Sequence, residues 1–196
     1  MIAIVDYGAG NVTSVKRAVD HVGHACVLAS DPAAVARADR IIVPGVGNFR
    51  ATAALGVNGL GAAVARHIAG GKPVLGICLG MQWFFQSSEE APDVAGLGIF
   101  AATCQGFPNA VKSPHVGWNQ LETRGESRLL RGVPSGQFAY FTHSYYAPRV
   151  DATVAWCDYS DGFSAAVEQE NLFGVQFHPE KSGDVGLAIL ENFCRC

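Results

Sequence analysis

Short apolar runs alternate with longer amphipathic stretches through the first half of the sequence. The runs have the length of strands and read "IAIV", "ACVL", "RIIVPG" and "KPVLGI". The stretches that follow them cover residues 12–22, 31–37, 49–69 and 79–87, and their apolar residues have helical spacing. This alternation predicts β/α units, in which helices cover both faces of a central, mostly parallel sheet.

The pattern changes near residue 98. From there the chain consists of short segments rich in β-branched and aromatic residues, separated by Gly, Pro, Asn and Asp: "GIFAAT", "HVGWNQLE", "FAYFTHSYYA", "ATVAWCDY", "FSAAVEQ" and "LFGVQFHPE". We expect additional strands here, several of them antiparallel, with a hairpin turn in "EQENLFG" and a closing helix at 183–193. Because no repeat or linker interrupts the chain, we expect residues 1–196 to form a single α/β domain.

Charge and cysteine content narrow the possible functions. The net charge of −3 and the pI near 6.0 provide no basic surface for nucleic acid or for an anionic membrane, so a small-molecule substrate is favoured. The six cysteines show no framework spacing, which indicates reduced thiols in a reducing compartment. The N-terminal "MIAIVDYGAG" lacks a basic region and contains Asp6, and no apolar run is long enough to span a bilayer. These features favour the cytoplasm.

Several motif-like stretches have simpler interpretations. Gly8 and Gly10 outline a dinucleotide-binding turn, but Thr13 stands where the third glycine belongs, so a tight strand-to-helix turn is favoured. Neither the terminal "CRC" nor the group around His21 and His24 has the second ligand pair of a structural zinc site. We expect neither a metal nor a cofactor. His67, in a helical stretch, is expected to be exposed or partly covered.

Cys78 lies in "VLGICLG", where a buried strand runs into a glycine-flanked turn. Gly76 and Gly80 reproduce the G-x-nucleophile-x-G elbow, in which small neighbours let the chain turn sharply and project the central side chain. At the N-terminus of the helix expected over 79–87, the thiolate form that attacks carbonyl carbon is favoured. The N–H of Leu79 would point toward the developing oxyanion.

A cysteine nucleophile also needs a base, and His178 is the best placed of the six histidines. It ends the apolar strand "LFGVQF" and is followed by Pro179 and Glu180. On an extended chain the ring and the carboxylate would face the same way, so Glu180 could orient the imidazole. A surface His-Pro-Glu turn is the alternative, but Cys78 favours the catalytic interpretation. In "RIIVPGVGNF", glycines could turn backbone N–H groups inward as further oxyanion donors, although the stretch alone would be only a loop.

Together and in this order, "PGVG", "GICLGMQ" and "GVQFHPEKS" resemble the class I, or triad, glutamine amidotransferase family over the full chain. Within that family, "YGAGN", "PGVGNF", "HVGWN" and "YFTHSYY" resemble the glutaminase subunits of imidazole glycerol phosphate synthases, from histidine biosynthesis. The resemblance implies a flavodoxin-like fold. It also implies hydrolysis of L-glutamine to glutamate and ammonia.

The resemblance assigns roles to individual residues. It makes Cys78, His178 and Glu180 the triad, acting through a glutamyl thioester. The remaining assignments are the oxyanion group Val46, Gly47 and Leu79, and the glutamine-binding group Gln82, Glu90, His143, Ser144 and Tyr145.

The resemblance also implies a partner. Ammonia would pass to a separate (β/α)₈-barrel cyclase subunit in a heterodimer, which makes imidazole glycerol phosphate and aminoimidazole carboxamide ribotide. Because the chain starts at its first strand and ends after its last helix, we expect no fused cyclase. Val116, where methionine or isoleucine is frequent in the family, leaves details of the docking face open.

Three other interpretations remain at this point. Glutaminase subunits for anthranilate, guanylate or pyridoxal phosphate synthesis would share the triad but differ from "HVGWN" and "THSYY". An inactive paralogue would act only as a binding module, although all three triad residues are present. A different cysteine hydrolase, such as a peptidase, would cleave peptides and leave free glutamine intact.

Overall fold

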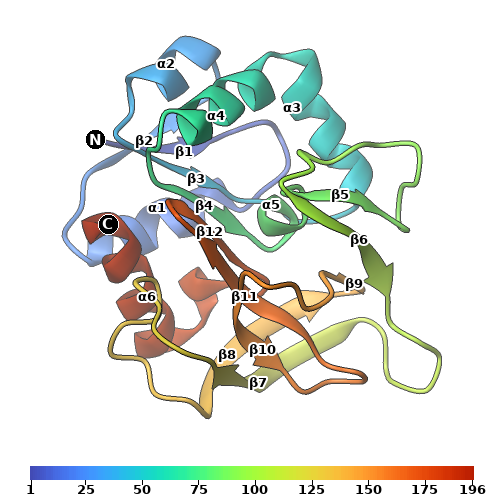
Figure 1. Cartoon of the computed structure of the whole chain (residues 1–196). Helices are drawn as coiled ribbons and strands as arrows, with labels where there is room; N and C mark the ends of the chain where they lie inside the picture. Colours follow the sequence, from blue (N-terminus) through green and yellow to red (C-terminus); the bar gives the residue numbers. More distant parts are fainter.

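A nine-stranded sheet forms the centre of the protein in the computed structural model, which describes residues 1–196 (Figure 1). The strand order is β2-β1-β3-β4-β12-β11-β10-β7-β8. The first five of these strands are parallel: β2 (Cys26–Ala29), β1 (Ile2–Val5), β3 (Arg40–Val43), β4 (Val74–Ile77) and β12 (Leu172–Val175). This order is that of a flavodoxin-like sheet, which confirms the expected fold class.

Helices cover both faces of the parallel strands (Figure 1). The helices α1 (Val12–His21) and α6 (Gly183–Arg195) pack on one face. The other face is covered by α2 (Pro32–Arg37), α3 (Ala53–Val57) and α4 (Leu60–Ala69). Because successive strand residues point to opposite faces, each parallel strand supplies side chains to two separate cores and is largely apolar.

The second half of the sheet is antiparallel, as the change of pattern near residue 98 predicted. It contains β11 (Phe163–Gln169), β10 (Thr153–Cys157), β7 (His115–Thr123) and β8 (Gln137–His143). The predicted hairpin joins β11 to β12, and its turn residue Glu170 has a positive φ of 52°. The closing helix α6 is also confirmed.

The prediction of a helix over residues 79–87 was largely wrong. Helix α5 (Leu79–Gln82) is a single turn, and the chain then enters strand β5 (Phe85–Ser88). The carbonyl groups of Trp83 and Phe84 accept hydrogen bonds from Leu97 and Ile99, at 2.6 and 2.9 Å, so tertiary pairing replaces further helical turns. Strands β6 (Phe100–Gly106) and β9 (Tyr145–Tyr146) complete this second, three-stranded sheet.

The helical stretch predicted over residues 49–69 is divided into three pieces. A short 3₁₀ segment (Phe49–Thr52) leads into α3, and Asn58 and Gly59 separate α3 from α4. Gly59 has a φ of +74°, which a continuous helix does not allow. His67, in α4, is buried rather than exposed or partly covered, because α4 packs this side of its surface into the protein.

Other features of the amino-acid sequence have simple structural counterparts. The turn that contains Gly8 and Gly10 leads from β1 into α1, where Asn11 caps the helix by accepting a hydrogen bond from the N–H of Ser14 at 3.3 Å. All six cysteines are free thiols. No helix combines the length and apolar character needed to cross a membrane.

Candidate active site

The candidate site lies where three neighbouring parallel strands end. Strands β3, β4 and β12 are adjacent in the sheet, so their carboxyl ends meet at one edge. The turn that begins at Pro44 follows β3, Cys78 follows β4, and His178 lies three residues beyond β12. The topology therefore brings together three motifs that are far apart in the sequence.

Cys78 occupies a strained backbone conformation, with φ 54° and ψ −109°. Positive φ is rare for a residue with a side chain and is typical of a nucleophile elbow. The neighbouring glycines are required by close approach: a Cβ on Gly76 would lie 2.6 Å from the backbone nitrogen of Met81, and one on Gly80 would overlap the carbonyl oxygen of Val43. The elbow predicted from the sequence is therefore present.

The helix after Cys78 contributes less than the sequence suggested. Because α5 has only four residues, its macrodipole is small. Leu79 is its first residue, and N–H groups in the first turn of a helix lack intrahelical acceptors. The N–H groups at this turn, rather than a long helix dipole, are therefore the source of positive potential near the sulfur.

His178 and Glu180 form a buried pair. The Nδ1 atom of His178 lies 2.9 Å from Oε1 of Glu180, and the two side chains are 2% and 1% exposed. The pairing was predicted for the wrong reason, because residues Pro179–Lys181 form a 3₁₀ turn rather than an extended chain. Pro179 fixes φ at the start of this turn and keeps His178 extended, and the turn brings the carboxylate back to the ring.

The electrostatics of His178 favour the charged imidazolium. Burial lowers its pKa, but the interactions with Cys78 and Glu180 outweigh burial and raise the pKa to about 10. The second ring nitrogen, Nε2, is buried and makes no hydrogen bond within the protein. A positive ring near the sulfur stabilises negative charge on Cys78, and its free nitrogen can exchange a proton with a reacting group.

Gln176 is a site residue that the sequence analysis missed. It is fully buried, and its Nε2 donates a hydrogen bond to Sγ of Cys78 at 3.5 Å. Its Oε1 accepts a hydrogen bond from Nε2 of Gln82 at 3.0 Å. The signal that could have revealed it is a polar residue inside the apolar run "LFGVQF".

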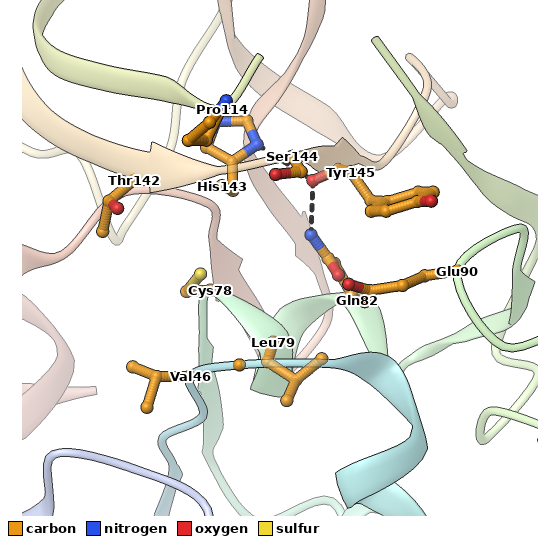
Figure 2. A pocket seen from close by; sticks show the side chains of 11 residues that line it. Val46, Cys78, Leu79, Gln82, Glu90, Pro114, Thr142, His143, Ser144 and Tyr145 are labelled. Atoms are coloured by element: carbon orange, nitrogen blue, oxygen red, sulfur yellow. Dashed lines mark hydrogen bonds between the residues drawn. The ribbon is translucent and has the colours of Figure 1, made fainter.

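A cavity of about 330 Å³ opens beside Cys78 (Figure 2). It contains all of the predicted oxyanion and glutamine-binding residues, so the structure brings these candidates together. It also contains Pro114 and Thr142, which the sequence analysis missed. The full lining is Val46, Gly47, Cys78, Leu79, Gln82, Glu90, Pro114, Thr142, His143, Ser144 and Tyr145. Glu90 is the only carboxylate in this lining, which gives the cavity a site for a cationic group.

The turn after β3 forms the wall of the cavity opposite Tyr145 (Figure 2). Gly47 has a φ of +92°, which few residues other than glycine adopt. Gly45 packs against the elbow, since a Cβ there would lie 2.7 Å from Cβ of Leu79. The turn and the elbow are therefore fitted closely to each other.

The other wall of the cavity is held by side-chain to backbone bonds. Nε2 of Gln82 donates to the carbonyl oxygen of Tyr145 at 2.7 Å (Figure 2). Oε2 of Glu90 accepts from the N–H of Phe49 at 2.7 Å. His143, also part of the lining, is buried. No group of three or more His, Cys, Asp or Glu side chains is arranged to hold a metal.

The amino-acid sequence is similar to one protein family and to named members of it. The family model described as "Glutamine amidotransferase class-I" matches residues 3–196. The chain is 48% identical to "Imidazole glycerol phosphate synthase subunit HisH" of Methanopyrus kandleri, over 96% of this chain and 94% of the relative. It is 46% identical to the protein of the same name from Thermococcus kodakarensis, over the full length of both.

Solved structures show the same fold at low sequence identity. A crystal structure of a glutamine amidotransferase has a TM-score of 0.78 and 18% identity, and the similarity covers 99% of this chain and all of that chain. The glutaminase domain of Trypanosoma brucei CTPS has a TM-score of 0.67 and 18% identity, with coverage of 99% and 93%.

Proposed function

The chain belongs to the class-I glutamine amidotransferase family, and we propose that it hydrolyses glutamine through Cys78, His178 and Glu180 as the glutaminase subunit of an imidazole glycerol phosphate synthase. Eight relatives at 42–48% identity carry the name of that subunit. Their names favour this function over anthranilate, guanylate or pyridoxal phosphate synthesis. They also favour it over a peptidase.

The observation that carries the proposal is the position of Cys78 at a strained elbow beside the buried His178–Glu180 pair. The sulfur, as thiolate, attacks the γ-carboxamide carbon of glutamine, and the C=O electron pair moves onto oxygen. Because the imidazolium of His178 carries a proton and is held by Glu180, it can donate that proton to the departing nitrogen. The C–N bond breaks, ammonia leaves, and a γ-glutamyl thioester remains on Cys78.

Hydrolysis of the thioester restores the enzyme. His178, now neutral, removes a proton from a water molecule that attacks the thioester carbon. The C–S bond breaks, glutamate is released and Cys78 returns to its thiolate form. Glu180 keeps its contact with Nδ1 and holds the imidazole of His178 in place in both half-reactions.

The oxyanion formed in each half-reaction needs hydrogen-bond donors. Leu79, at the start of α5, supplies one N–H, and the peptide between Val46 and Gly47 supplies the second. The positive φ of Gly47 and the position of this turn in the cavity lining support that assignment. Removing one donor of this kind typically costs about 10²- to 10³-fold in rate.

Glutamine itself carries an α-ammonium and an α-carboxylate. Glu90 is the charged group suited to the ammonium, because it is the only carboxylate in the cavity lining. Gln82 holds the Tyr145 carbonyl, and segment 143–145 forms the wall against which the substrate lies. These contacts would place the γ-carboxamide over Cys78.

The surface next to the cavity supports a protein partner. Val116, Trp118 and Phe138 are 49–55% exposed, and they lie on the same outward face of the β7–β8 hairpin as Thr142, which lines the cavity. An exposed apolar surface beside a site that releases ammonia suits a partner that consumes ammonia. We propose that this partner is the (β/α)₈-barrel cyclase in a heterodimer. The free thiols fit a cytoplasmic location.

Replacement Cys78→Ala in the complex with the cyclase tests this division of labour. Deleting one small sulfur should leave the fold and the complex intact. We expect synthase activity with glutamine to vanish. Activity with high ammonium at alkaline pH, where free NH₃ is abundant, should stay near that of the unmodified complex. Loss of both activities in a complex shown to be intact by gel filtration would contradict the proposal.

A further inference from the structure

Two buried histidines contact each other at the wall of the cavity, and one of them, His143, is a lining residue. His115 on β7 and His143 on β8 are paired across the strands, and their side chains are 5% and 7% exposed. Nδ1 of His115 lies 3.2 Å from Nε2 of His143. Neither ring is a general base in the proposed mechanism, so their arrangement calls for a separate explanation.

The hydrogen bond between His143 and the Tyr145 carbonyl fixes which atoms donate within the histidine pair. Nδ1 of His143 lies 2.9 Å from the carbonyl oxygen of Tyr145, and a carbonyl can only accept. Nδ1 of His143 must therefore carry a proton. In a neutral ring Nε2 is then an acceptor, and the proton shared with His115 must reside on Nδ1 of His115.

The other end of this chain of hydrogen bonds, at Asn119, leads to the same assignment independently. Oδ1 of Asn119 accepts a hydrogen bond from the N–H of Gln120 at 2.8 Å, which fixes the orientation of the amide. Nδ2 of Asn119 then faces Nε2 of His115 at 3.3 Å, so this ring nitrogen accepts and carries no proton. The Asn119 end therefore requires two neutral rings, each protonated on Nδ1, and the Tyr145 end agrees with this assignment.

The surroundings keep both rings neutral. His115 stacks on Tyr159 with ring centroids 4.1 Å apart, and Phe107 and Phe163 also contact the pair. Burial among these rings lowers the pKa of His115 to about 4 and that of His143 to about 3. The nearby positive charge of His178 also lowers the pKa of His143.

The carbonyl group of Tyr145 connects this chain of hydrogen bonds to the cavity. It accepts from His143 on one side and from Gln82 on the other, at 2.9 and 2.7 Å. A carbonyl oxygen has two lone pairs, so both are occupied by protein donors. The same Gln82 nitrogen continues through Gln176 to Cys78.

We propose that His115 is a positioning residue for the glutamine pocket: its Nδ1–H holds His143, which fixes the Tyr145 carbonyl and the wall that it belongs to. Asn119 sets the required tautomer from the far end. The proposal rests on the proposed function only in naming glutamine as the occupant of the cavity. The hydrogen-bond directions rest on geometry alone.

Nitrogen NMR of the full chain tests the directions without reference to activity. With ¹⁵N-labelled histidine, assigned by single His→Gln variants, His115 and His143 should both show a protonated Nδ1 and an unprotonated Nε2 at neutral pH. A protonated Nε2 on either ring would overturn the proposal. A protein that shows these tautomers but hydrolyses no glutamine would refute the proposed function and leave the hydrogen-bond chain standing.

Two substitutions separate positioning from packing. His115→Phe keeps an aromatic ring but has no donor, whereas His115→Asn loses the ring but keeps an N–H near the place of Nδ1. In the complex, we expect His115→Phe to raise KM for glutamine about three- to tenfold, the effect of one lost hydrogen bond, with kcat changed less than about twofold. His115→Asn should have a lower KM than His115→Phe. The reverse order would mean that the ring serves only packing.

Thr123→Ala is the matched control, since Thr123 ends the same strand on the face opposite the exposed apolar surface, and its side chain takes no part in the hydrogen-bond chain. We expect it to leave KM unchanged. A KM increase in this control equal to that of His115→Phe would show that any change in β7 disturbs the pocket, and would overturn the specific role of His115.

Discussion

At the scale of single residues, three buried histidines have pKa values shifted in opposite directions by their surroundings. The pKa of His178 is raised to about 10 because its interactions with Cys78 and Glu180 outweigh burial, whereas burial lowers the pKa of both His115 and His143. In the proposed mechanism, the same residue type is therefore a proton carrier in one place and a fixed hydrogen-bond donor in another. The difference is set by whether a carboxylate or an aromatic ring lies beside the imidazole.

The neutral histidines predict a loss of stability in acid. Their folded pKa values lie below the unfolded value near 6.5, so the unfolded chain binds more protons as the pH falls from about 6.5 toward 4. The free energy of unfolding should decrease over this range, by up to about 1.4 kcal/mol per pH unit for each histidine. Below the folded pKa values this dependence ends.

Urea denaturation at several pH values measures this effect. The comparison of His115→Asn with the unmodified protein cancels the carboxylates, which titrate in both. The variant should depend on pH less steeply, by about one proton. Equal slopes for the two proteins would contradict a neutral, buried His115.

The cluster of Cys78, His178 and Glu180 could be predicted because its signals in the sequence are local, and the family resemblance supplied most of the cavity lining, but three residues were missed. A cysteine between glycines and a His-Pro-Glu after an apolar strand can be recognised within a few residues. The three missed residues are Gln176, whose signal is a polar side chain within an apolar run, and Thr142 and Pro114, which carry no local signal. Thr142 reaches the cavity only because strands distant in the sheet order come together in space.

At the scale of elements, the sequence predicted strands better than helices. Each apolar run of the first half is a strand, since short runs rich in Val, Ile and Leu are recognisable from composition alone. "MQWFFQ" failed because a short apolar run fits helix and strand equally well, and main-chain pairing with residues 96–100 decided the outcome. The pairing partner lies outside any local window.

Because β3 and the elbow pack closely, adding one methyl group at Gly80 should lower the stability of the protein measurably. Gly80→Ala would place a Cβ onto the carbonyl oxygen of Val43, and the elbow would have to shift. We expect the free energy of unfolding to fall by about 1–3 kcal/mol, as for other overpacked cores. Urea denaturation checks this value.

Gly56→Ala is the matched control for that substitution. Gly56 is an exposed residue of α3, and a Cβ there would meet nothing within 4 Å. Because alanine is the better helix former, this variant should be unchanged or stabilised by up to about 1 kcal/mol. A Gly80→Ala protein as stable as Gly56→Ala would show that the elbow is loosely packed, against the structure.

At the scale of the whole molecule, the site lies where the parallel and antiparallel halves of the sheet meet. Strand β8 is the outermost strand, yet the N–H of His178 donates to the carbonyl of Tyr140 on β8 at 2.9 Å, and the N–H of Tyr140 donates to Ser182 at 2.9 Å. Strand β8 of the antiparallel half therefore lies against the segment that follows the carboxyl end of β12. This contact brings segment 142–145 over Cys78 and leaves the apolar face of the β7–β8 hairpin beside the cavity.

The central claim is that Cys78 is the nucleophile that attacks glutamine. Covalent labelling tests it most directly, with a glutamine analogue that carries an electrophilic carbon in place of the γ-carboxamide carbon, followed by peptide mass mapping. We expect one label per chain, on Cys78, which excess glutamine prevents and which neither Cys104 nor another buried thiol accepts. A label on a different cysteine, or continued glutamine hydrolysis by a protein fully labelled at Cys78, would contradict the account.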